Sequence, residues 1–107
     1  MNIRINLESE GLESIFKPYQ VKIMEYLWGS DKPKRSYDVW QGVGPENISR
    51  ASIINSLKWL RDLRFIKETT ETGKGGNRGL YEAFLTEQEI LVEVYDETRK
   101  KLSQEKN

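Results

Sequence analysis

The sequence predicts an α+β fold with three helices, a two-stranded hairpin and one further helix, in that order along the chain. Ile53, Leu57 and Leu60 recur at i, i+4 and i+7, which is the spacing of one buried face of a helix. Soon after this helix, the glycine-rich segment 73–79 separates two short runs of strand-forming residues. A helix followed directly by a hairpin therefore defines the middle of the chain.

Two helices are expected before this central helix. Pro18 suits the first position of a helix, and Gly29 closes the apolar helical pattern that follows it. Ser36 is expected to cap a second, shorter helix that ends at Gly44, and Ser49 is expected to cap the central helix. A short helix, a tight turn and a capped helix together predict a helix-turn-helix.

The hairpin is expected to pair residues 65–70 with residues 80–85, with 73–79 as the turn. Thr86 is then expected to cap a last helix that extends to about residue 102. Its first turn is acidic and its last turn is basic, as the helix dipole favours. The complete prediction is a winged helix-turn-helix, which is a three-helix core with a β-hairpin wing, plus an additional C-terminal helix.

Three segments follow from this order. Residues 1–16 are expected to form an N-terminal arm, either strand-like or loose, that turns helical near Leu12. Residues 17–86 are expected to form the winged helix-turn-helix domain, and residues 87–107 the C-terminal helix. At 107 residues the chain is long enough for one modest core and too short for two.

The composition argues against an enzyme and against a metal or cofactor site. The chain has no cysteine and no histidine, so it lacks thiolate chemistry, the commonest general base and the commonest zinc ligand. The glycines of 73–79 do not match the spacing of a phosphate-binding loop. No apolar run approaches the roughly 20 residues of a membrane span, and no signal peptide is recognised, so a cytoplasmic protein is expected.

The net charge of zero conceals an uneven distribution of charge. Residues 47–81 carry seven basic and three acidic side chains, whereas residues 82–107 carry four basic and seven acidic ones. A basic excess on the central helix and the wing is what contact with DNA phosphates by one face requires, although an excess of this size also arises by chance. We therefore expect double-stranded DNA as a partner.

The candidate DNA-binding residues lie on the central helix and the wing. Short polar or bidentate side chains near the start of a recognition helix can read base edges, and basic side chains further along can meet phosphates. The predicted base-reading residues are Arg50, Ser52, Asn55 and Ser56, the predicted phosphate contacts are Lys58, Arg61, Lys74 and Arg78, and Ser49 and Asn77 complete the set.

An apolar stripe on the last helix is a candidate dimerisation surface. Three helices and a hairpin already fill a core of this size, so the stripe is expected to meet a second copy of the chain. Packing within the same chain is the alternative. The stripe consists of Ile90, Leu91, Val94, Tyr95, Thr98 and Leu102.

Several motifs resemble those of winged-helix repressors. They are the run 24–28 (MEYLW), the helix 52–60, the junction 63–66 and the strand entry 78–81. Together they resemble the penicillinase-repressor group and, more loosely, the PadR- and MarR-like regulators. This resemblance implies homodimeric binding to operator DNA, with the C-terminal helix contributing to the dimer. The chain differs in its segment 1–16 and in its shorter C-terminal region, so regulation by cleavage is not expected.

The sequence thus predicts a sequence-specific, homodimeric transcriptional regulator that binds DNA and acts as a repressor by occlusion. The alternative is a winged-helix module for protein–protein interaction, which a neutral net charge permits. The sequence assigns no operator and no small-molecule effector.

Overall fold

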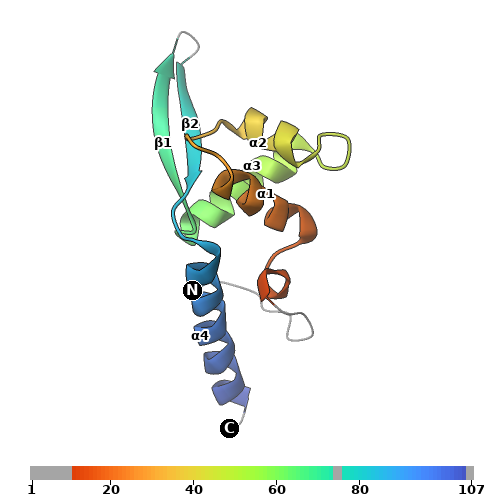
Figure 1. Cartoon of the computed structure of the whole chain (residues 1–107), viewed down its shortest axis with the longest axis vertical. Helices are drawn as coiled ribbons and strands as arrows, with labels where there is room; N and C mark the ends of the chain where they lie inside the picture. Colours follow the sequence, from red (N-terminus) through yellow and green to blue (C-terminus); the bar gives the residue numbers. More distant parts are fainter. Residues whose placement is uncertain (1–10, 74–75, 106–107) are drawn as a thin grey trace.

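The computed structural model describes residues 11–73 and 76–105, and it has the predicted α+β architecture. Helices α1 to α3 form a bundle beside the β1–β2 hairpin, and α4 extends away from the bundle along the long axis of the molecule (Figure 1). The elements are η1 (Gly11–Ser14), α1 (Pro18–Trp28), α2 (Ser36–Val43), α3 (Arg50–Asp62), β1 (Ile66–Gly73), β2 (Gly76–Ala83) and α4 (Glu87–Glu105).

The predicted starts of two helices are confirmed by their capping bonds. The backbone N–H of Ser52 donates to the hydroxyl of Ser49 at 3.1 Å, so Ser49 caps α3. At α4, the N–H of Glu89 donates to the Thr86 hydroxyl (3.1 Å) and the N–H of Thr86 donates to the Glu89 carboxylate (3.0 Å). This reciprocal pair is a capping box, which the sequence T-x-x-E encodes directly.

The prediction for the start of α2 was wrong by one residue. Arg35 occupies the N-cap position and Ser36 is the first residue of the helix. The backbone N–H of Arg35 donates to the carboxylate of Asp38 at 3.3 Å, so the acidic residue at the third helical position closes the first turn from the opposite direction to a serine cap.

The hairpin is longer than predicted, and its turn is shorter. The two strands pair antiparallel from Ile66↔Ala83 to Gly73↔Gly76, so residues 76–79 belong to β2 and not to the turn. The glycines of 76–79 predicted a turn, but they pair with β1 through backbone hydrogen bonds, which do not require a side chain. Gly76 has φ of +103°, a conformation that favours glycine.

The segment before α2 forms an isolated antiparallel β-bridge with the hairpin. The N–H of Lys34 donates to the carbonyl of Tyr81 at 2.8 Å, and the N–H of Tyr81 donates to the carbonyl of Lys34 at 2.7 Å. This bridge joins the loop that leads into α2 to the C-terminal part of β2. It therefore fixes where Arg35 lies relative to the wing.

The core lies where the three helices meet the base of the hairpin. Its fully buried side chains include Ile53, Leu57 and Leu60, the three residues whose spacing predicted α3. Phe16 is also buried, and its ring meets the rings of Trp59 and Phe65 edge to face at centroid distances of 5.6 and 6.0 Å.

The predicted boundary of the N-terminal arm at residue 16 was therefore wrong. Leu12 and Phe16 are part of the hydrophobic core, and η1 packs against α4. The core of the described residues therefore begins at Leu12. Residues 1–10 of the predicted arm lie outside the described residues.

The apolar stripe predicted on α4 divides into a buried and an exposed part. Ile90 and Val94 are buried within the single chain, so they were wrongly assigned to a dimer interface. Leu91 and Thr98 are half-buried, and the Thr98 hydroxyl donates to the carbonyl of Val94. The stripe residues Tyr95 and Leu102 remain exposed, at 63% and 44%. Among the described residues, no helix combines the length and apolar character needed to cross a membrane.

Candidate nucleic-acid interface

Helix α3 presents one row of exposed side chains away from the core. Its inward face carries Ile53, Leu57 and Leu60, and the residues at the opposite side of the helix are exposed. This outward row consists of Ala51, Asn55, Lys58 and Asp62. Of the predicted base-reading residues, Asn55 is the one at the centre of the row.

Ser56 was wrongly predicted to read bases. Its side chain is 3% exposed and faces α1. Its hydroxyl accepts a hydrogen bond from the side-chain amide of Gln20 (3.1 Å) and donates to the hydroxyl of Tyr19 (3.3 Å). Ser56 is thus a satisfied polar residue of the α1–α3 packing, where DNA cannot reach it.

Ser49 and Ser52 use their hydroxyl groups to begin α3. Besides accepting from the backbone of Ser52, the Ser49 hydroxyl donates to the Ser52 hydroxyl at 2.9 Å. Ser52 is also half-buried. These bonds favour a structural role for both serines over the predicted contact with DNA.

Arg61 joins α3 to the wing. Its guanidinium donates to the carboxylate of Glu68 on β1 at 2.7 Å and to that of Asp62 at 3.1 Å. Hydrogen bonds from the Tyr81 hydroxyl, the larger influence, and from the Arg61 guanidinium hold the pKa of Glu68 below its ordinary value. The pKa of Tyr81 is raised to about 12, mainly by burial and also by the hydrogen bond to Glu68. The geometry favours this structural network over the predicted phosphate contact of Arg61.

Three arginines from separate segments line a single hollow. Arg35 precedes α2, Arg50 begins α3, and Arg78 lies on β2. The hollow has a volume of about 410 Å³. Arg50 was predicted to read bases, but its position beside Arg35 and Arg78 favours contact with phosphate instead.

Arg35 is the candidate site residue that sequence reasoning missed. It lies in the basic run 32–35, which carries two lysines and this arginine. A loop has no periodicity that indicates which way its side chains point, so only the charge of this run could have drawn attention to it.

The wing carries the remaining predicted contacts. Arg78 is exposed and lies opposite Glu71 in the strand register. Asn77 belongs to β2, but its side chain lies outside the described part of the chain, as does Lys74 altogether. These two predictions stay untested.

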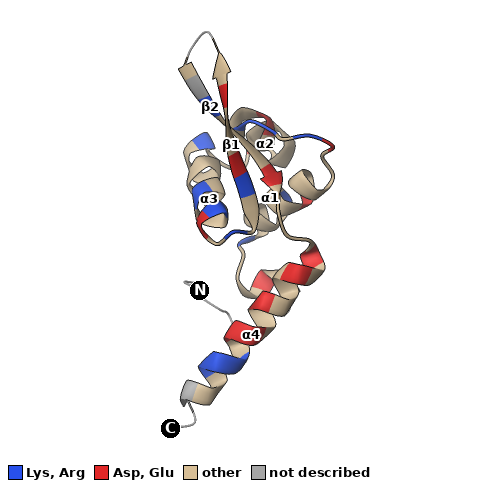
Figure 2. Ribbon diagram, turned by 90° about the vertical axis from the view of Figure 1, so that its left-hand side faces the viewer, with Lys and Arg blue, Asp and Glu red and all other residues tan. Residues whose placement is uncertain are grey.

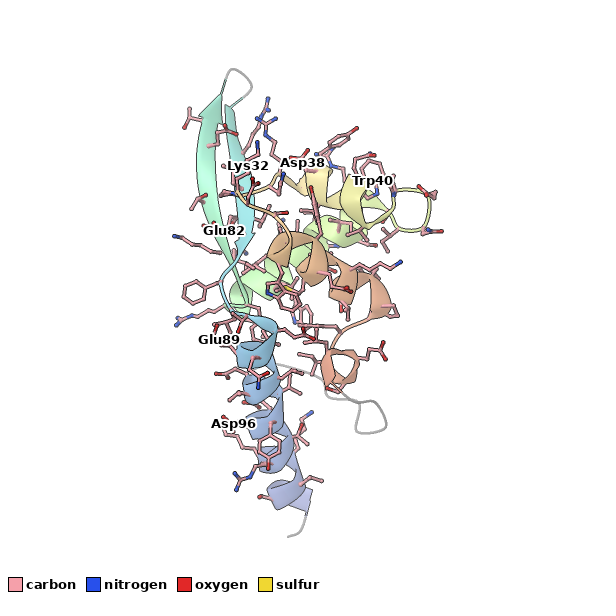
Figure 3. All side chains as sticks on the ribbon, in the orientation of Figure 1. Lys32, Asp38, Trp40, Glu82, Glu89 and Asp96 are labelled. Atoms are coloured by element: carbon pink, nitrogen blue, oxygen red, sulfur yellow. The ribbon has the colours of Figure 1, made fainter. Side chains whose placement is uncertain are left out.

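The charges separate along the molecule (Figure 2). Lys and Arg mark α3, the segment before α2 and part of the wing, whereas Asp and Glu dominate the first half of α4. In Figure 3, Asp38 and Trp40 on α2 lie far along the long axis from Glu89 and Asp96 on α4. Within residues 11–73 and 76–105, no cluster of acidic side chains is arranged to hold a metal ion. The arrangement suits binding of a polyanion at one end.

Comparisons with known proteins identify the fold. No protein-family model matches the chain, and no curated protein matches its sequence. A solved structure described as a possible transcriptional regulator from Methanosarcina mazei Go1 is similar, with a TM-score of 0.67 and 14% identity over 84% of this chain and 76% of that one. A PadR family transcription regulator from Clostridium difficile R20291 has a TM-score of 0.57 and 20% identity over 83% of this chain and 97% of that one.

These likenesses support the looser of the two predicted resemblances at the level of fold. One of the two solved structures is PadR-like, and neither is described as a penicillinase repressor. The α+β architecture of four helices and an antiparallel hairpin is therefore the winged helix-turn-helix found in PadR-like transcription regulators.

Proposed function

We propose that the protein is a homodimeric, sequence-specific DNA-binding regulator of transcription that acts as a repressor by occluding its operator. One observation carries this proposal, which is the convergence of Arg35, Arg50 and Arg78 beside the exposed row of α3. These arginines come from positions distant in the sequence, and nothing in the packing of the core requires them to meet. The likeness to transcription regulators adds support at the level of fold.

In this proposal, the outward row of α3 enters the major groove. The groove is about 12 Å wide and accepts one α-helix. Asn55 at the centre of the row can bond to adenine with both the oxygen and the nitrogen of its side-chain amide, and Lys58, also exposed, can meet a base or a phosphate. The wing and the segment before α2 then lie over the phosphates on either side.

A dimer through α4 would place two such units on one operator. The exposed residues Tyr95 and Leu102 lie on the same side of α4 as the half-buried Leu91, which leaves an apolar row for a partner helix. The charge order of α4 suits antiparallel pairing, because its first half is acidic and residues 99–101 are basic. A two-fold dimer matches a palindromic operator.

The test is fluorescence anisotropy of the full chain with a labelled random-sequence duplex, titrated with salt. We expect salt-sensitive binding, and we expect Arg78→Gln to lower the slope of log K against log salt by about one unit. The matched control is Lys22→Gln, which removes one exposed positive charge from α1, outside the proposed interface. Absence of binding at low salt would contradict the proposal and favour a protein-interaction module.

A further inference from the structure

The hollow lined by Arg35, Arg50 and Arg78 has the composition of an anion-binding site. Its remaining walls come from the start of α2 and from β2, and Asp38 contributes the one carboxylate among its lining residues. Three guanidinium groups against one carboxylate give the lining of the hollow a net positive charge. The lining residues that complete it are Ser36, Tyr37, Asp38 and Gly79.

The hollow is held in place by contacts on each side. The guanidinium of Arg50 lies over the ring of Tyr37, with its carbon 5.8 Å from the ring centroid, and Tyr37 in turn meets the ring of Trp40. The Trp40 indole N–H donates to the carbonyl of Ile48 at 2.7 Å, which fixes the turn between α2 and α3. The Lys34 bridge holds the backbone beside Arg35 on the other side, so the segments that carry Arg35 and Arg50 are positioned before any ligand arrives.

Glu71 lies at the rim of this hollow. Its carboxylate accepts a hydrogen bond from the Arg35 guanidinium at 3.2 Å, and it is the register partner of Arg78 across the hairpin. The side chains of Arg35 and Glu71 are 47% and 44% exposed, and ion pairs with this exposure are weak and exchange readily. Within residues 11–73 and 76–105, neither Arg50 nor Arg78 forms a comparable ion pair.

We infer that the hollow binds one phosphate group, and that Glu71 holds Arg35 at its rim until a phosphate displaces the carboxylate. Guanidinium groups match the oxygens of a phosphate with paired N–H donors, and a phosphate in the hollow faces three guanidinium groups, whereas the Glu71 carboxylate bonds to that of Arg35. The inference rests on the proposed function for the source of this phosphate, which is the DNA backbone. The chemistry of the site is the same for a free phosphate ion.

The first experiment tests the site without DNA. Inorganic phosphate is titrated into the full chain and followed by backbone amide NMR, with sodium chloride at matched ionic strength as the reference. We expect shifts at residues 36–38, Arg50 and Arg78 that exceed those in chloride and that shrink in Arg35→Gln. Equal shifts in phosphate and chloride would overturn the site.

The second experiment tests the displacement of Glu71 with random-sequence duplex DNA. We expect Glu71→Gln to tighten binding about two- to fivefold, the range that the energies of exposed ion pairs allow. The matched control is Glu82→Gln, which removes the same charge from the base of the hairpin and should leave affinity almost unchanged. In an Arg35→Gln background, the gain from Glu71→Gln should fall.

The outcomes separate the two proposals. An equal gain from Glu71→Gln with and without Arg35 would overturn the displacement, because it would reflect general repulsion alone. Phosphate binding in the hollow without DNA binding would support the site, contradict the proposed function and indicate a free phosphorylated ligand. DNA binding that does not depend on Arg35, without phosphate shifts, would overturn the site and leave the proposed function in place.

Discussion

The two ends of this molecule differ in charge and in the side chains that they expose. The end formed by α2, α3 and the wing is basic, and its side chains are fixed by capping bonds, an aromatic contact and a backbone bridge. Helix α4 is acidic in its first half and leaves Tyr95 and Leu102 uncovered further along. A net charge of zero thus results from two regions of opposite character, and each region favours a different kind of partner.

The two ends also differ in how they are joined to the core. The indole N–H of Trp28 donates to the carbonyl of Leu85 at 2.9 Å, which fastens the start of α4 to the end of α1. Beyond this point, Ile90 and Val94 pack inward and the remaining turns extend past the bundle (Figure 1). Substitutions should therefore affect stability near the core and association near the end of α4.

The largest effect is expected from Phe16→Ala. Phe16 is 4% exposed and contacts Trp59 and Phe65, so its removal should lower the free energy of unfolding by about 3–5 kcal/mol. Urea unfolding measures this change, and Lys22→Ala on the exposed side of α1 is the control. A loss below about 1 kcal/mol would show that residues 11–16 do not stabilise the core, because truncation of a buried aromatic side chain costs more than this.

A smaller effect, confined to association, is expected from Tyr95→Glu. Burial of a large apolar side chain contributes about 1.5–3 kcal/mol, and a charge placed in an apolar interface opposes association further. Sedimentation should show a shift from dimer to monomer with little change in the urea midpoint. The control is Lys22→Glu, the same new residue at an exposed position of α1 outside the proposed dimer interface. A dimer that is insensitive to Tyr95→Glu would remove α4 from the interface.

Asn55→Ala should act at the other end and change specificity alone. Once an operator has been selected from random duplexes, we expect this variant to lose about 1–3 kcal/mol of discrimination between the operator and one with a substituted base pair. Arg78→Gln should weaken binding to both duplexes alike, because phosphates carry no sequence information. Anisotropy on the two duplexes measures both. Equal losses from the two substitutions would contradict the division between base and phosphate contacts.

The architecture could be predicted from the sequence because local signals agree with it. The spacing of Ile53, Leu57 and Leu60 placed the buried face of α3, and Thr86 placed the start of α4. The same spacing also puts Ser56 on the buried face, at i+3 from Ile53, but its polar side chain suggested the opposite. Position on a helix should have outweighed residue type at this site.

The site was less predictable because it depends on contacts between distant segments. Arg35, Arg50 and Arg78 meet through the Lys34 bridge and the α2–α3 turn, neither of which leaves a pattern in the sequence. Arg61 was also judged from its place on the helix alone, which suggested an unpaired side chain. In the structure it forms an ion pair with Glu68 on β1, the strand that follows α3. The charge of an arginine therefore does not tell whether it lines the hollow or forms a structural ion pair, because that depends on which residues lie beside it in the fold.

The last prediction concerns the network that fastens the wing to α3. Tyr81 ionises from a neutral to a charged form, and its pKa is raised to about 12 by burial and by Glu68, whereas an unfolded tyrosine titrates near 10. Since the folded pKa lies above the unfolded one, the stabilisation is fully present below pH 10 and is lost as the pH rises toward 12. Burial, followed by Asp38, also raises the pKa of Tyr26, so ultraviolet titration should resolve late-ionising phenols of which the latest is missing in Tyr81→Phe. If the phenol that Tyr81→Phe removes titrates near pH 10 instead, the network does not hold Tyr81 as the structure shows, and the wing is free to move independently of α3.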